Sequence, residues 1–167
     1  MHPISDLQIE YSLISRGIED EILPPARELG IGITAYGVLS RGLISGHWSK
    51  ERSAPKDFRQ MSPRFQGSNL DSNLALVDQL RAIADDIGAS PAQVAIAWVA
   101  AQGNDIVPLV GARRRDRLTE ALGALEVKLT DAHLPDLAKA FPPGVASGER
   151  YPEAQLAHMD SERKLTA

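Results

Sequence analysis

Residues 105–122 read DIVPLVGARRRDRLTEAL, and this stretch decides the fold that the sequence predicts. A short apolar run leads into Gly111, and a helical pattern then begins within a cluster of arginines and continues to Leu122. The order of strand, glycine turn and helix is typical of a βα unit. A chain built from several such units forms a parallel sheet.

Arginines occupy positions 113, 114, 115 and 117 at the start of the predicted helix. The first N–H groups of a helix have no partner inside it and attract anions, and a guanidinium binds phosphate through paired hydrogen bonds. Gly111 lets the backbone come close to a ligand. This pattern favours a phosphate site. Asp116 and Glu120 leave a second interpretation open, in which the arginines form ion pairs on an ordinary solvated helix face.

Two βα units precede this stretch. Residues 7–13 alternate apolar with polar side chains and predict a strand, and residues 18–29 follow with apolar side chains at helical spacing. Residues 31–36 form a second apolar run, as expected for a parallel strand covered on both faces. The sequence therefore predicts an α/β fold with about three parallel strands and covering helices. Three parallel strands with open edges make a poor stand-alone sheet.

Further helices are predicted around a long irregular connection. Residues 37–69 show no sustained period, and residues 72–87 return to helical spacing. Ser90 and Pro91 begin another helix in the favoured N-cap and N1 arrangement. A short helix follows Thr130, and residues 145–167 have so little periodicity that we expect them to lie over the surface.

The composition is that of one soluble globular domain, which we place at residues 1–167. A net charge of -4 argues against a nucleic-acid partner. The chain has no cysteine, which excludes disulfides, thiolate chemistry and cysteine-type zinc sites, and its four histidines lack metal-type spacing. It also shows no signal-peptide pattern and no bilayer-spanning stretch, so we expect no membrane partner and a cytoplasmic location.

A set of motifs along the chain occurs in one known family. The motifs are LQIEYSL at 7–13, GITAYGVLSRG at 32–42, PAQVAIAW at 91–98, IVPLVGAR at 106–113 with RLTE at 117–120, and GERYP at 148–152. In this order they resemble the carboxyl-terminal half of the aldo-keto reductases, whose fold is a (β/α)8 barrel and whose cofactor is a nicotinamide dinucleotide, usually NADPH. The resemblance implies a partial (half) TIM-type barrel in which the three strands are the sixth, seventh and eighth.

The resemblance also implies a set of cofactor-binding residues. Gln8 matches the glutamine that hydrogen-bonds the nicotinamide carboxamide, and Tyr36 matches the aromatic residue that stacks on the nicotinamide ring. The loop along the pyrophosphate corresponds to Gly37, Leu39, Ser40 and Arg41. The loop and helix start that hold the 2′-phosphate and the adenine correspond to Gly111, Ala112, Arg113, Arg117 and Glu120. The implied cofactor is therefore NADP(H), with Arg113 and Arg117 as the phosphate-binding arginines.

Some positions depart from the family pattern. The family commonly has serine or threonine where this chain has Ala112, and asparagine where it has Ala121. The family's catalytic tetrad of aspartate, tyrosine, lysine and histidine lies on strands two to four, and no such set in this chain lies on matching motifs. We therefore predict no catalytic residue and no metal ligand, and we expect the chain alone to be inactive.

The implied function is that of a portion of an aldo-keto reductase type oxidoreductase that binds NADP(H) for carbonyl reduction. It takes a small carbonyl substrate if an amino-terminal half completes it. We expect self-association, since pairing covers the open strand edges and the exposed half-core. Two alternatives stay open: a non-catalytic NADP-binding or interaction protein, and an inactive truncated gene product.

Overall fold

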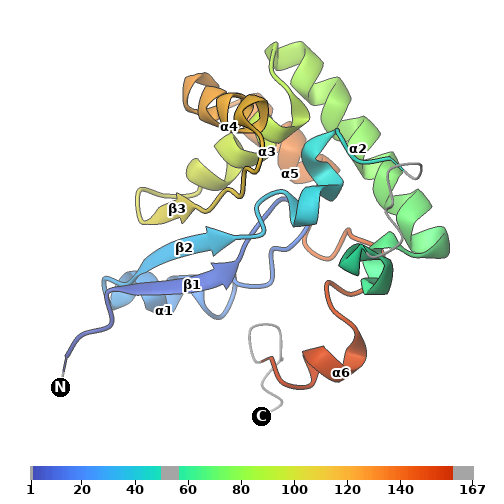
Figure 1. Ribbon diagram of the computed structural model, residues 1–167. Helices are drawn as coiled ribbons and strands as arrows, with labels where there is room; N and C mark the ends of the chain where they lie inside the picture. The colour runs from blue at the N-terminus through green and yellow to red at the C-terminus, as the bar shows by residue number, and fades with distance from the viewer. Residues whose placement is uncertain (1, 50–56, 160–167) are drawn as a thin grey trace.

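The computed structural model describes residues 2–49 and 57–159, and a three-stranded parallel sheet lies at its centre (Figure 1). Strands β1 (Asp6–Glu10), β2 (Gly32–Tyr36) and β3 (Ile106–Pro108) lie side by side in chain order. Gln8 is paired with Thr34, and Thr34 with Val107, so these side chains share one face of the sheet. The predicted α/β fold with three parallel strands is confirmed.

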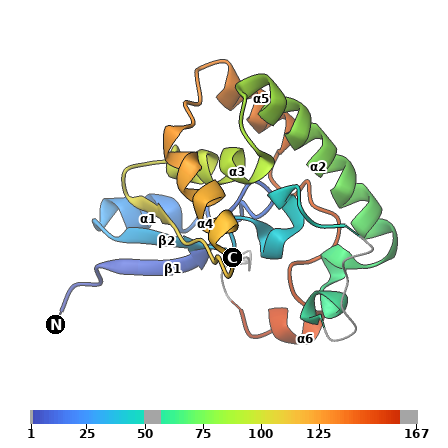
Figure 2. The same ribbon diagram turned by 45° about the horizontal axis from the view of Figure 1, so that its top comes forward.

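Six α-helices and four 3-10 helices are described around the sheet. In both ribbon views α2 to α5 gather on one side of the strands, while α6 lies apart from α3 and α4 at the end of the tail (Figures 1 and 2). The α-helices are α1 (Leu23–Glu28), α2 (Gly67–Ile87), α3 (Pro91–Ala100), α4 (Arg115–Leu122), α5 (His133–Ala140) and α6 (Glu153–Leu156). The 3-10 helices are η1 (Ser40–Ser45), η3 (Phe58–Met61), η4 (Pro63–Phe65) and η5 (Gly123–Glu126).

One face of the sheet carries the core. Ile9, Ile33 and Ile106, one from each strand, are buried in a single cluster with apolar side chains of α2 and α3. The other face is open at Gln8, which is exposed, and at Val107, which is 62% exposed. A closed barrel fills its interior with layers of side chains from all its strands. Three parallel strands covered by helices on one face agree with the predicted part of a TIM-type barrel.

The start of α3 shows why the local prediction succeeded. The Ser90 Oγ accepts a hydrogen bond of 3.2 Å from the Gln93 backbone N–H, and the Ser90 N–H donates to the Gln93 side-chain oxygen at 2.9 Å. Pro91 follows at the first helical position, where its missing N–H costs nothing. These contacts lie within four consecutive residues, so the sequence alone specifies them.

Several boundaries differ from the predicted ones. β1 ends at Glu10, because residues 12–15 form a tight turn closed by a bridge between Ser12 and Ser15. The helix predicted over residues 18–29 is reduced to α1, because Pro24 and Pro25 have no N–H to continue a longer helix and are placed at its start. α2 begins at Gly67, five residues before the predicted start at 72, which shortens the irregular connection.

Arg150 contradicts the expectation that the tail, residues 145–167, lies over the surface. Arg150 is only 2% exposed, and its guanidinium lies 3.2 Å from the Glu10 carboxylate of β1. The pair joins residues that are 140 positions apart, and such a contact leaves no periodicity in the sequence. Residues 160–167 lie outside the described part. Among the helices described, none is both long and apolar enough to span a membrane.

Candidate cofactor site

A pocket of about 400 Å³ opens where β2 and β3 end. Its walls come from the loop after β2, one side of α3, the loop after β3 and one side of α4. Barrel enzymes place their ligand sites at this end of the strands, and the volume is in the range of small-molecule pockets. The lining residues are Gly37, Val38, Leu39, Arg41, Gly42, Ser45, His47, Ala92, Ile96, Leu109, Val110, Gly111, Arg117, Glu120 and Ala121.

The pocket brings together two of the segments to which the resemblance assigns the cofactor. From the first loop it takes Gly37, Leu39 and Arg41, and from the second loop and α4 it takes Gly111, Arg117 and Glu120. The other predicted residues lie outside the lining. Gln8 is exposed on the sheet, and Ala112 and Arg113 are exposed after Gly111. Tyr36 contacts Arg150 of the tail, and Ser40 contacts Ser12 in the turn after β1.

The loop after β2 has an unusual backbone. Ser40 and Arg41 have φ angles of +46° and +57°, and Gly42 follows at +89°. Left-handed conformations are strained for residues with a side chain, and such strain concentrates at ligand sites. Gly37 also has a positive φ of +68°, and a Cβ there would lie 3.0 Å from the Glu10 Cγ. Both the conformation and the closeness of Glu10 therefore favour glycine at position 37.

The side chains of this loop are fixed by other segments. Ser40 is buried and its hydroxyl lies 3.4 Å from the Ser12 hydroxyl, so its side chain is engaged outside the pocket lining. The Arg41 guanidinium donates to the Arg150 carbonyl oxygen at 2.8 Å and lies 4.3 Å from the centroid of the Tyr151 ring. Of the four residues predicted for the pyrophosphate loop, Ser40 and Arg41 therefore have side chains that contacts with other segments fix.

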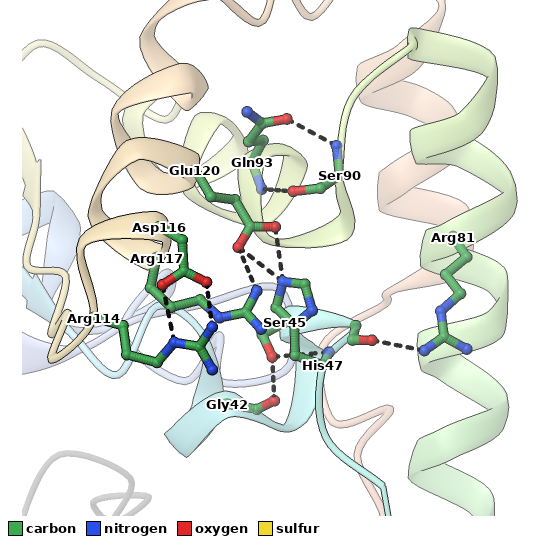
Figure 3. A network of polar contacts seen from close by, with 11 residues as sticks. Gly42, Ser45, His47, Arg81, Ser90, Gln93, Arg114, Asp116, Arg117 and Glu120 are labelled. Carbon is green, nitrogen blue, oxygen red and sulfur yellow. Dashed lines mark hydrogen bonds and ion pairs between the residues drawn. The ribbon is translucent and has the colours of Figure 1, made fainter.

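The α4 side of the pocket is built around Glu120 (Figure 3). Its two carboxylate oxygens each lie 2.8 Å from the His47 Nε2, and Arg117 donates to one of them at 3.0 Å. Burial raises the pKa of the Glu120 carboxyl, but hydrogen bonds with His47, Ser90 and Arg117 outweigh burial and hold the pKa below its ordinary value. Glu120 is therefore an anion that holds Arg117 in the pocket wall.

The ion pairs of the solvated-face interpretation are also present. Arg114 pairs with Asp116 at 2.7 Å, and both side chains are exposed. Arg117 and Glu120 form an (i, i+3) pair of α4. Arg114 thus fits the solvated face, whereas Arg117 is both paired and part of the pocket wall.

Gly111 is the position that best fits a closely bound ligand. It is not among the glycines with positive φ, and a Cβ built on it meets no atom of the described residues within 4 Å. Neither the backbone conformation nor packing among the described residues therefore requires glycine. Gly111 also lines the pocket, so its open backbone suits the close approach of a phosphate.

Tyr36 lies at the end of β2, next to the pocket loop. Its hydroxyl lies 3.3 Å from the Arg150 guanidinium, and burial, followed by a hydrogen bond with Tyr151, raises its pKa to about 12. The sequence interpretation assigned no site role to Arg150 or Tyr151, although the GERYP motif at 148–152 contained both. His47 was missed as well, and no motif marked it. No metal-binding group of three or more acidic, histidine or cysteine residues occurs in the described parts of the chain.

Comparison with known proteins identifies the family. The model of the aldo/keto reductase family matches residues 1–141. The chain belongs to this family. A Glycine max protein named "Probable aldo-keto reductase 1" is 42% identical over 151 residues, which are 90% of this chain and 44% of that relative. The structure of a glycerol dehydrogenase from Gluconobacter oxydans matches with a TM-score of 0.75 and 32% identity, over 85% of this chain and 44% of that one.

The aldo-keto reductase chain described here thus spans less than half the length of both relatives. The family is one of oxidoreductases with a barrel fold, and the three parallel strands and their helices agree with part of that barrel.

Proposed function

We propose that this chain is the carboxyl-terminal half of an aldo-keto reductase barrel, with strands six to eight in a single domain over residues 1–167, and that it binds NADP(H) for reduction of a small carbonyl substrate. One observation carries the proposal. The pocket at the ends of β2 and β3 combines the loop of Arg41 with the loop and helix of Gly111, Arg117 and Glu120. The resemblance assigns the first loop to the pyrophosphate and the second to the adenosine 2′-phosphate.

The residues of this chain supply charge and shape for such a ligand. Arg41 and Arg117 offer guanidinium donors to phosphate oxygens, and Gly111 leaves room for the backbone to approach them. Tyr36 offers an aromatic face to the nicotinamide. When bound, NADPH supplies the hydride for a carbonyl carbon. Carbonyl reduction also needs a placed proton donor, and no tetrad set of this chain lies on matching motifs, so we propose that the chain binds the cofactor without turning it over alone.

Exposed apolar side chains support completion of the barrel by further strands. Val107 and Leu109, at the edge of the sheet, are 62% and 49% exposed. Leu118, Leu122 and Leu125 are at least 50% exposed, and their spacing places them along one stripe of α4 and η5. A neighbouring strand and helix would bury this surface. In the isolated chain, a second copy is expected to cover it.

Arg117→Ala tests the proposed phosphate contact. Losing a charge-assisted bond to the 2′-phosphate should weaken the binding of NADPH roughly 10- to 150-fold. The binding of NADH, which lacks that phosphate, should weaken by less than about threefold. The dissociation constants are measured by titrating the cofactor fluorescence. Arg114→Ala is the matched control, because it removes an arginine of the same segment whose exposed side chain pairs with Asp116 outside the pocket.

If Arg117→Ala weakened the binding of NADPH and NADH equally, that result would contradict the proposed contact of Arg117 with the 2′-phosphate. No saturable fluorescence change of the wild-type chain at near-millimolar NADPH would contradict cofactor binding itself. A panel of aldehydes tests the second half of the proposal through the NADPH absorbance. We expect no turnover by this chain alone, and measurable turnover would show that its own residues supply the proton.

A further inference from the structure

Residues 147–151, here named the tail strap, contact two residues of the proposed cofactor site from outside the pocket. We infer that Arg150 and Tyr151 of this strap are positioning residues, which hold the Tyr36 ring and the Arg41 guanidinium in the orientations that a nicotinamide and a pyrophosphate require. The inference rests on the proposed function, because it concerns how that site keeps its shape.

The tail strap is anchored to the body of the protein. The Asn73 side chain, which is buried in α2, accepts from the Ser147 N–H at 2.8 Å and donates to the Ser147 carbonyl oxygen at 2.9 Å. The Arg64 side chain donates to the Gly148 carbonyl oxygen at 3.3 Å. In both ribbon views the tail passes beside the segment of η3 and η4 on its way to α6 (Figures 1 and 2). A strap fixed in this way is able to orient other side chains.

The first residue that the strap orients is Tyr36. The Arg150 guanidinium is held by the buried Glu10 carboxylate at 3.2 Å and lies 3.3 Å from the Tyr36 hydroxyl. The Tyr151 side chain is hydrogen-bonded to Tyr36 as well. Contacts at the hydroxyl fix the direction in which the ring points, and because a phenol O–H lies in the plane of its ring, a hydrogen bond that it donates to Tyr151 also favours one ring plane. Stacking depends on that plane, so these contacts favour a ring that is ready to receive a flat ligand.

The second residue is Arg41. Its guanidinium is hydrogen-bonded to the Arg150 carbonyl oxygen at 2.8 Å and lies over the Tyr151 ring at 4.3 Å. A guanidinium has five N–H donors, more than this contact with Arg150 uses, so it can hold the strap and bind a phosphate together. The cation–π contact limits the freedom of a long side chain, which lowers the entropy cost of binding.

A purely structural strap predicts a different result. Loss of general stability would weaken binding of every ligand of the site to a similar extent. A positioning strap affects only ligands that reach Tyr36 and Arg41. NADPH reaches both regions in the proposed site, whereas 2′-AMP contains the adenine and the 2′-phosphate but neither the nicotinamide nor any phosphate of the pyrophosphate. Comparing these two ligands separates the two roles.

The test uses the full chain with two substitutions of one residue. Tyr151→Phe removes the hydroxyl that bonds Tyr36 and keeps the ring beneath Arg41, while Tyr151→Leu removes both contacts. We expect Tyr151→Phe to weaken the binding of NADPH about fivefold, a factor typical of one lost hydrogen bond. Tyr151→Leu should weaken NADPH binding further. Binding of 2′-AMP should change less than about twofold in both. Tyr11→Phe is the control, since its hydroxyl bonds Glu19 outside the pocket.

Equal weakening of both ligands by Tyr151→Leu would overturn the inference. A second measurement needs no cofactor: the chain is labelled with fluorotyrosine, and the ¹⁹F resonance of Tyr36 is assigned with Tyr36→Phe. That resonance should move or narrow in Tyr151→Leu and stay unchanged in Tyr11→Phe. An unchanged Tyr36 resonance in Tyr151→Leu would also overturn the inference. If wild type binds neither ligand, the proposed function fails, while the resonance still decides whether the strap holds the ring.

Discussion

Replacing Arg150 with methionine should destabilise the protein strongly, because it leaves a buried carboxylate without its nearest guanidinium. Glu10 is 5% exposed and Arg150 is 2% exposed, and their charged groups are 3.2 Å apart. Methionine keeps a long apolar side chain, so the main change is the loss of the charge partner. Breaking a buried ion pair by removing one partner costs about 3–5 kcal/mol of the free energy of unfolding.

The other contacts of Glu10 place the expected cost near the lower limit. The Ser15 hydroxyl still donates to its Oε1 at 2.8 Å, and the Arg64 guanidinium remains 4.0 Å from the same oxygen. A loss of about 3 kcal/mol is a large part of the roughly 5–15 kcal/mol by which domains are stable. It should lower the Tm by about 6–12 °C in a chain of this size.

Thermal unfolding followed by circular dichroism and urea unfolding followed by tryptophan fluorescence both measure this loss. Arg27→Met is the matched control: Arg27 lies 2.8 Å from Asp105, but the two side chains are 42% and 31% exposed. Breaking that pair should cost less than about 1 kcal/mol. If Arg150→Met costs as little as Arg27→Met, the reasoning that the tail belongs to the core is refuted.

Gly111→Ala should change the free energy of unfolding by less than about 1 kcal/mol, since the added Cβ meets open space. It should nevertheless weaken the binding of NADPH in the fluorescence titration. Unchanged affinity would contradict a close approach of the ligand to this backbone. The Tyr36 pKa rises from 10.0 to about 12 through burial and its bond to Tyr151, so the folded state keeps a proton that the unfolded chain loses. The free energy of unfolding should therefore fall as the pH rises through this interval, and fall less in Tyr36→Phe; equal slopes would contradict the shift. Sedimentation should show a dimer or larger species, and a monomer would mean that the exposed stripe of Leu118 and Leu122 needs no cover.

The parts of the fold that local sequence specifies were predictable. Ser90 and Gln93 cap α3 through contacts within four residues, and the apolar runs around Ile33 and Ile106 become β2 and β3. Parallel order follows from the alternation of such runs with helical segments. Boundaries were less predictable where two signals competed, as at Pro24, where helical spacing extends across a residue that has no N–H.

The contacts that shape the candidate site are not local. Arg150 and Glu10 are 140 residues apart, and His47 and Glu120 are 73 residues apart. Neither pair produces a periodic pattern, and an isolated arginine in an irregular tail has the appearance of a surface residue. The left-handed backbone of Ser40 is equally hidden, because serine has no special preference for it. Only the family resemblance indicated which loops meet.

The two interpretations of the arginine cluster are compatible, because each describes different arginines. Arg114 and Asp116 are exposed and pair within α4's first turn, where solvent screening leaves such a pair little energy. Arg117 is partly buried, and Glu120 holds its guanidinium in the pocket wall while His47 holds Glu120 (Figure 3). An anion bound there would meet an arginine whose side chain is already ordered, which reduces the entropy lost on binding. The Glu120 charge would oppose a phosphate at the same place, and its contacts with both His47 and Arg117 are the interactions that would offset this repulsion at the proposed site.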